Sequence, residues 1–156
     1  MPFYSMEEDA YWEQMPPALK HLQSESAGHF RVVYFVLGDE TEPTTPTVAV
    51  LEMFPGCVIT RHAHTCERFE IVIKGSLDVG ERVLHPGDVM VSHAGQEYGP
   101  HTAGADGCTT LEVFGTYEGS YTPIYPGPDG PVMVDWSRPG GGERKAAIGA
   151  AAGPAA

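Results

Sequence analysis

The chain has 156 residues, with 21 acidic against 9 basic side chains and a formal net charge of −12. This length suits one domain with its own core. The acidic balance argues against nucleic acid or an anionic membrane as a partner. No apolar run approaches the roughly 20 residues of a bilayer span, and the acidic N-terminus lacks the basic-then-apolar layout of a signal peptide. These features predict a soluble, cytoplasmic protein.

The first segment of the chain predicts short helices. Ser5 followed by Glu8 fits a capping box, so a helix is expected over about residues 6–14. Pro16 and Pro17 end it, and "ALKHL" can form a second helical turn.

From His29 onward the sequence predicts strands and turns. The expected strands share β-branched and aromatic residues bounded by Gly, Pro or Asp, and they cover 29–37, 47–54, 68–74, 76–84 (a hairpin), 89–92, 108–117 and 131–136. Short strands at this spacing are typical of a β-sandwich or β-barrel. The last segment, from Ser137, is low-complexity Gly, Ala and Pro with few large apolar residues. We therefore divide the chain into an N-terminal helical arm (1–28), a barrel (29–136) and a flexible tail (137–156).

One short motif carries the candidate chemistry. His62 and His64 are two residues apart, so on a strand they point to the same side. Glu70 shares that parity, and two imidazoles with a carboxylate suit Fe(II), Mn(II), Ni(II) or Zn(II). The alternative interpretation is a pair of solvated polar residues. Hydrophobic patterning would put Phe69 and Ile73 toward the core and the histidines outside, although a barrel with a ligand cavity can invert this arrangement.

Two motifs resemble those of the cupin family. Gly56, His62, His64 and Gly75 follow the spacing of the first cupin motif, and "PGDVMVSHAGQEY" supplies the glycines and aspartate of the second motif. The resemblance spans about residues 45–117 by strand-and-turn matching. It implies an all-β, cupin-type jelly-roll β-barrel with a short N-terminal helical segment, often a homodimer, and a mononuclear metal in the barrel mouth.

The sequence departs from the family pattern where two ligands are expected. Arg68 stands in the usual glutamate slot, and Tyr98 stands in the usual histidine slot of the second motif. We expect a divalent transition metal, with iron favoured over Mn, Ni or Zn, and with these ligands: His62, His64, Glu70 and His101. Glu67 and Glu112 remain alternatives for the carboxylate, and Tyr98 remains an alternative for the fourth ligand.

Three functions remain open at this stage. The first is a non-haem iron dioxygenase acting on an anionic or oxygen-rich small molecule. In it Tyr98 donates a hydrogen bond or proton, and Arg68 binds the substrate anion or pairs with Glu70 or Glu112. The second is a metal-free isomerase or epimerase, with His62 or His64 as base and Tyr98 as acid. The third is a non-catalytic cupin that binds a small molecule.

Overall fold

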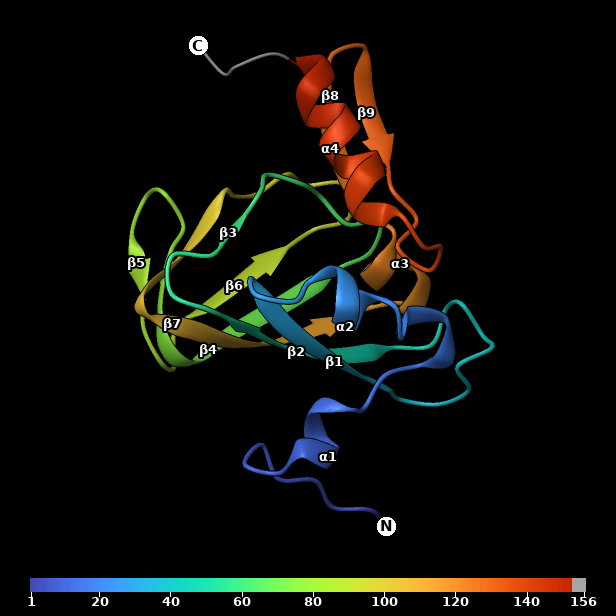
Figure 1. The fold of residues 1–156 in the computed structure, drawn as a ribbon, viewed down its shortest axis with the longest axis vertical. Coiled ribbons are helices and arrows are strands. Elements are labelled where there is room, and N and C mark those ends of the chain that lie inside the picture. The colour runs from blue at the N-terminus through green and yellow to red at the C-terminus, as the bar shows by residue number, and fades with distance from the viewer. Residues whose placement is uncertain (153–156) are drawn as a thin grey trace.

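The structure is a computed structural model that describes residues 1–152 and consists mainly of β-strands (Figure 1). The strands are β1 (Phe30–Val36), β2 (Thr47–Met53), β3 (Val58–Ile59), β4 (Arg68–Asp78), β5 (Val83–Leu84), β6 (Val89–Ser92), β7 (His101–Phe114), β8 (Ile124–Gly127) and β9 (Gly130–Met133). The helical elements are α1 (Asp9–Trp12), the 3₁₀ turn η1 (Pro17–Leu19), α2 (Leu22–Glu25), α3 (Tyr117–Tyr121) and α4 (Gly141–Ala152). An all-β fold preceded by short helices is thus confirmed. Over the described range, no helix has the length and apolar character needed to cross a bilayer.

One antiparallel sheet of seven strands builds the barrel. Its order is β1-β2-β7-β4-β5, with β3 paired to β7 and β6 paired to β4. The register between β4 and β7 shifts between Val72 and Lys74 and again between Gly75 and Leu77. Such bulges bend and twist strands, as closing a sheet into a barrel requires. The separate hairpin of β8 and β9 lies beside α4 (Figure 1).

Gly75 shows why the first cupin motif ends on a glycine. Its φ is +74°, a conformation that disfavours any side chain, and a Cβ placed there would lie 2.1 Å from the carbonyl oxygen of Gly107. The second bulge of β4 therefore tolerates only glycine.

The N-terminal helical segment packs against the barrel through apolar side chains. Leu19 is fully buried, and Leu22 is 8% exposed. Both belong to a cluster with Val32, Ala49 and Phe114, which come from β1, β2 and β7. The segment is therefore part of the barrel wall rather than a free arm.

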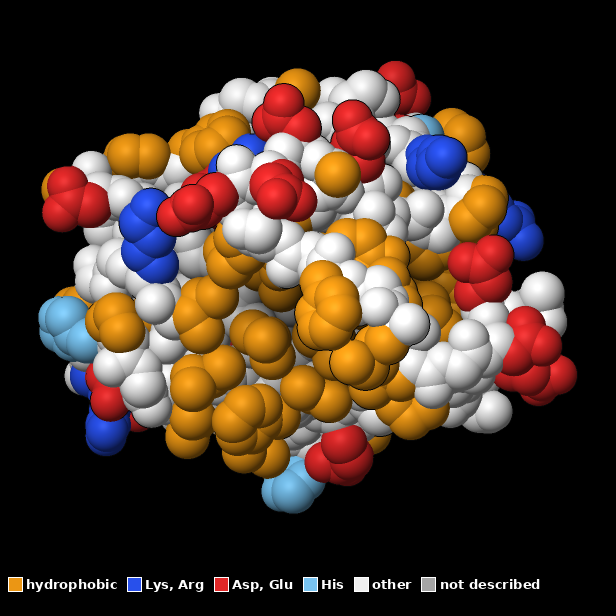
Figure 2. Space-filling model, turned by 90° about the horizontal axis from the view of Figure 1, so that it is seen from below, with side chains coloured by type: hydrophobic (Ala, Val, Ile, Leu, Met, Phe, Trp, Pro, Cys, Tyr) orange, Lys and Arg blue, Asp and Glu red, His pale blue; other side chains and the backbone are white. Residues whose placement is uncertain are grey.

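Strand β4 is inverted relative to ordinary hydrophobic patterning. Arg68 and Glu70 are buried, whereas Phe69 and Ile73 are 38% and 37% exposed. Val91 on the neighbouring β6 is also exposed, and Figure 2 shows hydrophobic side chains gathered on one face of the molecule. The polar side of the strand thus faces the barrel interior, which is the arrangement expected when the interior holds a cavity.

The C-terminal segment differs from the sequence expectation. Where a flexible tail is predicted over 137–156, the structure has helix α4 over Gly141–Ala152, and 153–156 lie outside the described residues. The run "ERKAAIGAAA" contains strong helix formers. The backbone N–H groups of Gly140 and Gly142 donate to the carboxylate of Glu25, at 3.0 and 3.4 Å, which satisfies donors at the start of the helix.

Candidate functional site

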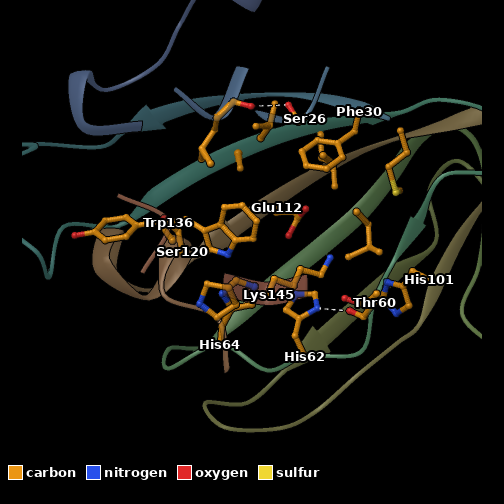
Figure 3. A pocket seen from close by; sticks show the side chains of 18 of the residues that line it. Ser26, Phe30, Thr60, His62, His64, His101, Glu112, Ser120, Trp136 and Lys145 are labelled. Atoms are coloured by element: carbon orange, nitrogen blue, oxygen red, sulfur yellow. Dashed lines mark hydrogen bonds between the residues drawn. The ribbon is translucent and has the colours of Figure 1, made fainter. Parts of the chain in front are cut away.

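The barrel encloses one large cavity of about 590 Å³ (Figure 3). Its walls come from the inner face of the sheet, from α2 and from the first turns of α4. The apolar part of the lining includes Phe30, Val32, Leu51, Met53, Phe114 and Trp136. The polar part consists mainly of His62, His64, Arg68, Glu70, Tyr98, His101 and Glu112. The cavity has the size and mixed lining of a small-molecule site.

Backbone pairing on both sides holds the two motif histidines. His62 exchanges two hydrogen bonds with Tyr98, at 3.1 and 2.9 Å, and Ala63 exchanges two with Ile124, both at 2.8 Å. This extended conformation turns His62 and His64 to the same side, as strand parity predicts. Their rings are 5.1 Å apart between centroids, and both residues are buried.

The hydrogen bonds of His62 fix its tautomer. Its Nδ1 lies 2.7 Å from the carbonyl oxygen of Thr60, which can only accept, so Nδ1 carries the proton. Nε2 is then the acceptor, and the hydroxyl of Tyr98 donates to it at 2.9 Å. Thr60, His62 and Tyr98 thus form a hydrogen-bonded chain that ends on a phenol.

His64 is oriented in the same way but has a free second nitrogen. Its Nδ1 donates to the carbonyl oxygen of Gly119 at 2.7 Å, so Nε2 is an acceptor. Over residues 1–148, where side chains are described, no hydrogen bond engages that atom. The third histidine, His101, begins β7 and is 4% exposed, with its ring 5.3 Å from that of Tyr98.

Burial sets the protonation state of these rings. Burial lowers the pKa of His62 to about 3, helped by the neighbouring His64 and by the positive charge of Arg68. Burial and Arg68 also lower the pKa of His64 and of His101 to about 4. The pKa of Tyr98 is raised well above its ordinary value, mainly by burial. At neutral pH the site therefore holds three neutral imidazoles and a neutral phenol.

Arg68 joins two carboxylates that face each other across the sheet. Glu70 on β4 lies directly opposite Glu112 on β7. Arg68 donates from Nη2 to Glu70 at 2.5 Å and from Nε to Glu112 at 2.7 Å, and all three residues are buried. Its remaining nitrogen, Nη1, is buried without a hydrogen-bond partner in the described part of the chain, and the guanidinium carbon lies 4.4 Å from the centroid of the Tyr98 ring.

These contacts change the expected ligand set for a metal. His62 and His64 both line the cavity and have Nδ1 held by a carbonyl, as metal-ligating histidines do, but the Nε2 of His62 accepts from Tyr98. Glu70, however, is engaged by Arg68, and a cation beside a dication is unfavourable. Glu67, the alternative carboxylate, is exposed and contacts His93 instead.

Glu70 thus pairs with Arg68 in this structure, and the set of four ligands expected from the sequence stays a prediction. Within residues 1–152, no three His, Cys, Asp or Glu side chains are grouped so that they could hold one ion. Glu70 has a structural reason to be unavailable, because its charge is needed to balance a buried arginine.

The charged cavity residue Lys145 was missed by sequence reasoning, because it comes from the segment predicted to be a tail. The alanine-rich composition around Lys145 was a signal for a helix. Tyr125 of β8, expected from its aromatic character in a lid or a dimer contact, lines the cavity. Glu112, left undecided from the sequence, was detectable as a charge inside an apolar strand.

Comparison with known proteins identifies the type of fold. No protein-family model matches the sequence, and no curated protein is similar to it. Among solved structures, the chain is similar to an RmlC-like cupin protein from Ralstonia eutropha JMP134, with 19% identity, a TM-score of 0.50, and coverage of 70% of this chain and 68% of the other. It is also similar to oxalate decarboxylase, with 18% identity and a TM-score of 0.50 over 60% of this chain, but that match spans 27% of the enzyme. At these identities the likeness concerns architecture alone, and on that basis the chain has the cupin fold.

Proposed function

We propose that the protein is a small acid–base enzyme that moves a proton on an organic molecule bound in the cavity, as an isomerase or epimerase does. The observation that carries this proposal is a pair of neutral groups held in the cavity: His64, whose Nδ1 is bonded to Gly119, and Tyr98, whose hydroxyl is bonded to His62. A base and an acid in fixed orientation are the minimum equipment for proton transfer.

His64 is the proposed base. Its Nε2 is an unprotonated acceptor on the cavity side, and its Nδ1 bond to Gly119 fixes the ring. A proton removed from a carbon next to a carbonyl passes to Nε2, and the electron pair moves onto the carbonyl oxygen as an enolate. Return of the proton to another atom, or to the other face of the same carbon, completes an isomerisation or epimerisation.

Tyr98 and Arg68 are the proposed stabilisers of that enolate. Tyr98 stays protonated at neutral pH because its pKa is raised. Its hydroxyl proton rests on His62 Nε2 and can turn from there to a developing oxyanion. Arg68, under the Tyr98 ring, contributes a fixed positive charge nearby. Donors aimed at developing charge in a dry cavity are among the strongest contributors to catalysis.

Deuterium incorporation tests this function across a range of candidate substrates. The protein is incubated in D₂O with a panel of α-substituted aldehydes, ketones and oxo acids, and exchange at the α-carbon is followed by NMR. We expect exchange for compounds that bind, a loss of at least 100-fold in His64→Gln, and a smaller loss in Tyr98→Phe. His93→Gln, at an exposed histidine, is the matched control. Binding without any exchange would instead favour a non-catalytic cupin.

A metal-dependent reaction, such as the iron dioxygenase predicted from the sequence, is the second candidate. It is supported by His62 and His64, which line the cavity and have Nδ1 bonded to a carbonyl, the arrangement typical of metal-ligating histidines. Elemental analysis of untagged protein separates the two candidates. Stoichiometric iron, manganese, nickel or zinc that is lost in the His62→Ala, His64→Ala double variant would replace the acid–base proposal.

A further inference from the structure

The first turns of α4 form part of the cavity wall. Gly142, Lys145 and Ala146 all line the cavity, and their spacing of three and four residues places them on one face of the helix. In the view of Figure 3, Lys145 lies among the same lining residues as His62, His64 and Trp136. A residue outside the barrel thus reaches the site.

Two sets of contacts hold α4 in this position. Glu25 of α2 accepts from the backbone N–H groups of Gly140 and Gly142. On the other side, Arg144 donates to three carbonyl oxygens of the preceding loop, those of Asp135, Arg138 and Pro139, at 2.7 to 2.8 Å. The position of Lys145 is therefore set by an anchored backbone.

Lys145 is a cavity cation without a counter-ion. The residues that line the cavity include two basic side chains, Arg68 and Lys145. Arg68 already forms ion pairs with two carboxylates. Lys145 makes no ion pair within the described part of the chain. Burial lowers its pKa, so a negative partner would stabilise the charged amine.

The ammonium group of Lys145 lies close to Tyr125, which in turn lies close to His62. Its Nζ lies 5.6 Å from the centroid of the Tyr125 ring, and that ring lies 5.7 Å from the ring of His62. Lys145 and His62 are therefore both neighbours of the Tyr125 ring, and all three side chains line the same cavity.

We infer that Lys145 binds the carboxylate of the ligand, so that the substrate class is an apolar organic acid carrying a carbonyl group. The carboxylate contact of Lys145 stands by itself. The carbonyl group of the ligand rests on the proposed function, in which Tyr98 binds the carbonyl oxygen beside the charge of Arg68. The apolar walls contributed by Phe30, Leu51 and Trp136 hold the body of the molecule between them.

Paired probes test the inference by binding alone. The affinities of 3-phenylpropanoate and its primary amide are measured by calorimetry for the wild type, Lys145→Met, Lys145→Arg and the control Lys20→Met, which removes an exposed lysine. We expect Lys145→Met to weaken the acid about ten- to hundred-fold while leaving the amide unchanged, and Lys145→Arg to retain most of the preference. Affinity for the acid should also fall as pH rises through the lowered pKa of Lys145.

Each other outcome counts against the inference. Equal affinity for acid and amide in the wild type, unchanged acid binding in Lys145→Met, or no binding of either probe overturns it. Thermal unfolding of Lys145→Met verifies that the fold is intact. If the acid preference depends on Lys145 but no compound exchanges deuterium, the proposed function fails and the binding role remains. If compounds exchange deuterium but the protein binds acid and amide equally well, the binding role of Lys145 fails and the proposed function remains.

Discussion

Removal of the Arg68 charge is the sharpest test of the site electrostatics. Glu70 and Glu112 are opposite each other on β4 and β7, both buried, and only Arg68 lies between their charges among the described residues. Arg68→Met keeps the length and apolar stem of the side chain but leaves two facing carboxylates uncompensated. Breaking a buried ion pair by removing one partner costs about 3–5 kcal/mol.

Urea unfolding at pH 8, followed by tryptophan fluorescence, measures this loss. With a slope of about 2 kcal/mol per molar urea, the midpoint should move down by about 2 M. The matched control is Arg61→Met, which breaks an exposed pair with Glu97 and should cost about 0–1 kcal/mol.

The loss should depend on pH in a defined direction. Burial raises the pKa of Glu70 even with Arg68 present, and without Arg68 that pKa should rise further. In the wild type, charging Glu70 already costs stability between the unfolded pKa of 4.5 and the folded pKa of about 7, so the extra loss in the variant develops as pH rises above about 7. The variant should therefore lose less stability at pH 5.5 than at pH 8.

Two results would refute this reasoning. One is a loss in Arg68→Met no larger than in Arg61→Met. The other is a failure of the added change Glu70→Gln to restore part of the stability, since that change removes one of the two opposed charges.

Two further predictions concern acid stability and backbone geometry. Because the folded pKa values of His62, His64 and His101 lie below 6.5, the unfolded state binds more protons, and stability should fall as pH drops from about 6.5 toward 4. The loss is about 2 kcal/mol per histidine between pH 7.5 and pH 5, and urea midpoints at the two pH values measure it. His64→Gln should make stability depend less steeply on pH. Equal stability at the two pH values would contradict the lowered pKa values. Gly75→Ala should cost about 3 kcal/mol or more, because a Cβ meets a carbonyl oxygen at 2.1 Å, whereas Gly80→Ala, with nothing within 4 Å, should cost about 1–2 kcal/mol. Equal melting temperatures for these two variants would show that the bulge can relax.

Strands β1, β2, β4 and β6 were predictable because they depend on local chemistry, whereas β3 and β8 were missed, and β7 spans His101–Phe114 instead of the expected 108–117. Alternating β-branched residues between Gly and Pro turns specify short strands. The two cupin-like motifs, in their order along the chain, indicate the fold that these strands form. The parity of His62 and His64 also follows from chain geometry alone. By contrast, which side of β4 faces inward depends on the cavity, a tertiary property that hydrophobic patterning assigns to the opposite face.

The site was only partly predictable, because the pairing of strands across the sheet decides which charged side chains contact each other. The sequence offers Glu70 both as a ligand and as a partner of Arg68. The register that puts Glu70 opposite Glu112 makes the buried arginine necessary to both. Lys145 was missed for a similar reason. The alanine-rich run around it favours a helix, but helix α4 is held on the barrel by Glu25, more than a hundred residues earlier, and nothing local indicates that contact.

The bonds between Glu25 and the start of α4 have a consequence for biosynthesis. They join residues 115 and 117 positions apart, so they form only after every barrel strand has left the ribosome. The pairing of the sheet does not involve α4, so the sheet can close before the wall made by α4 is in place. During that interval the apolar lining is open to solvent and to chaperones, and a ligand can enter without displacing the helix.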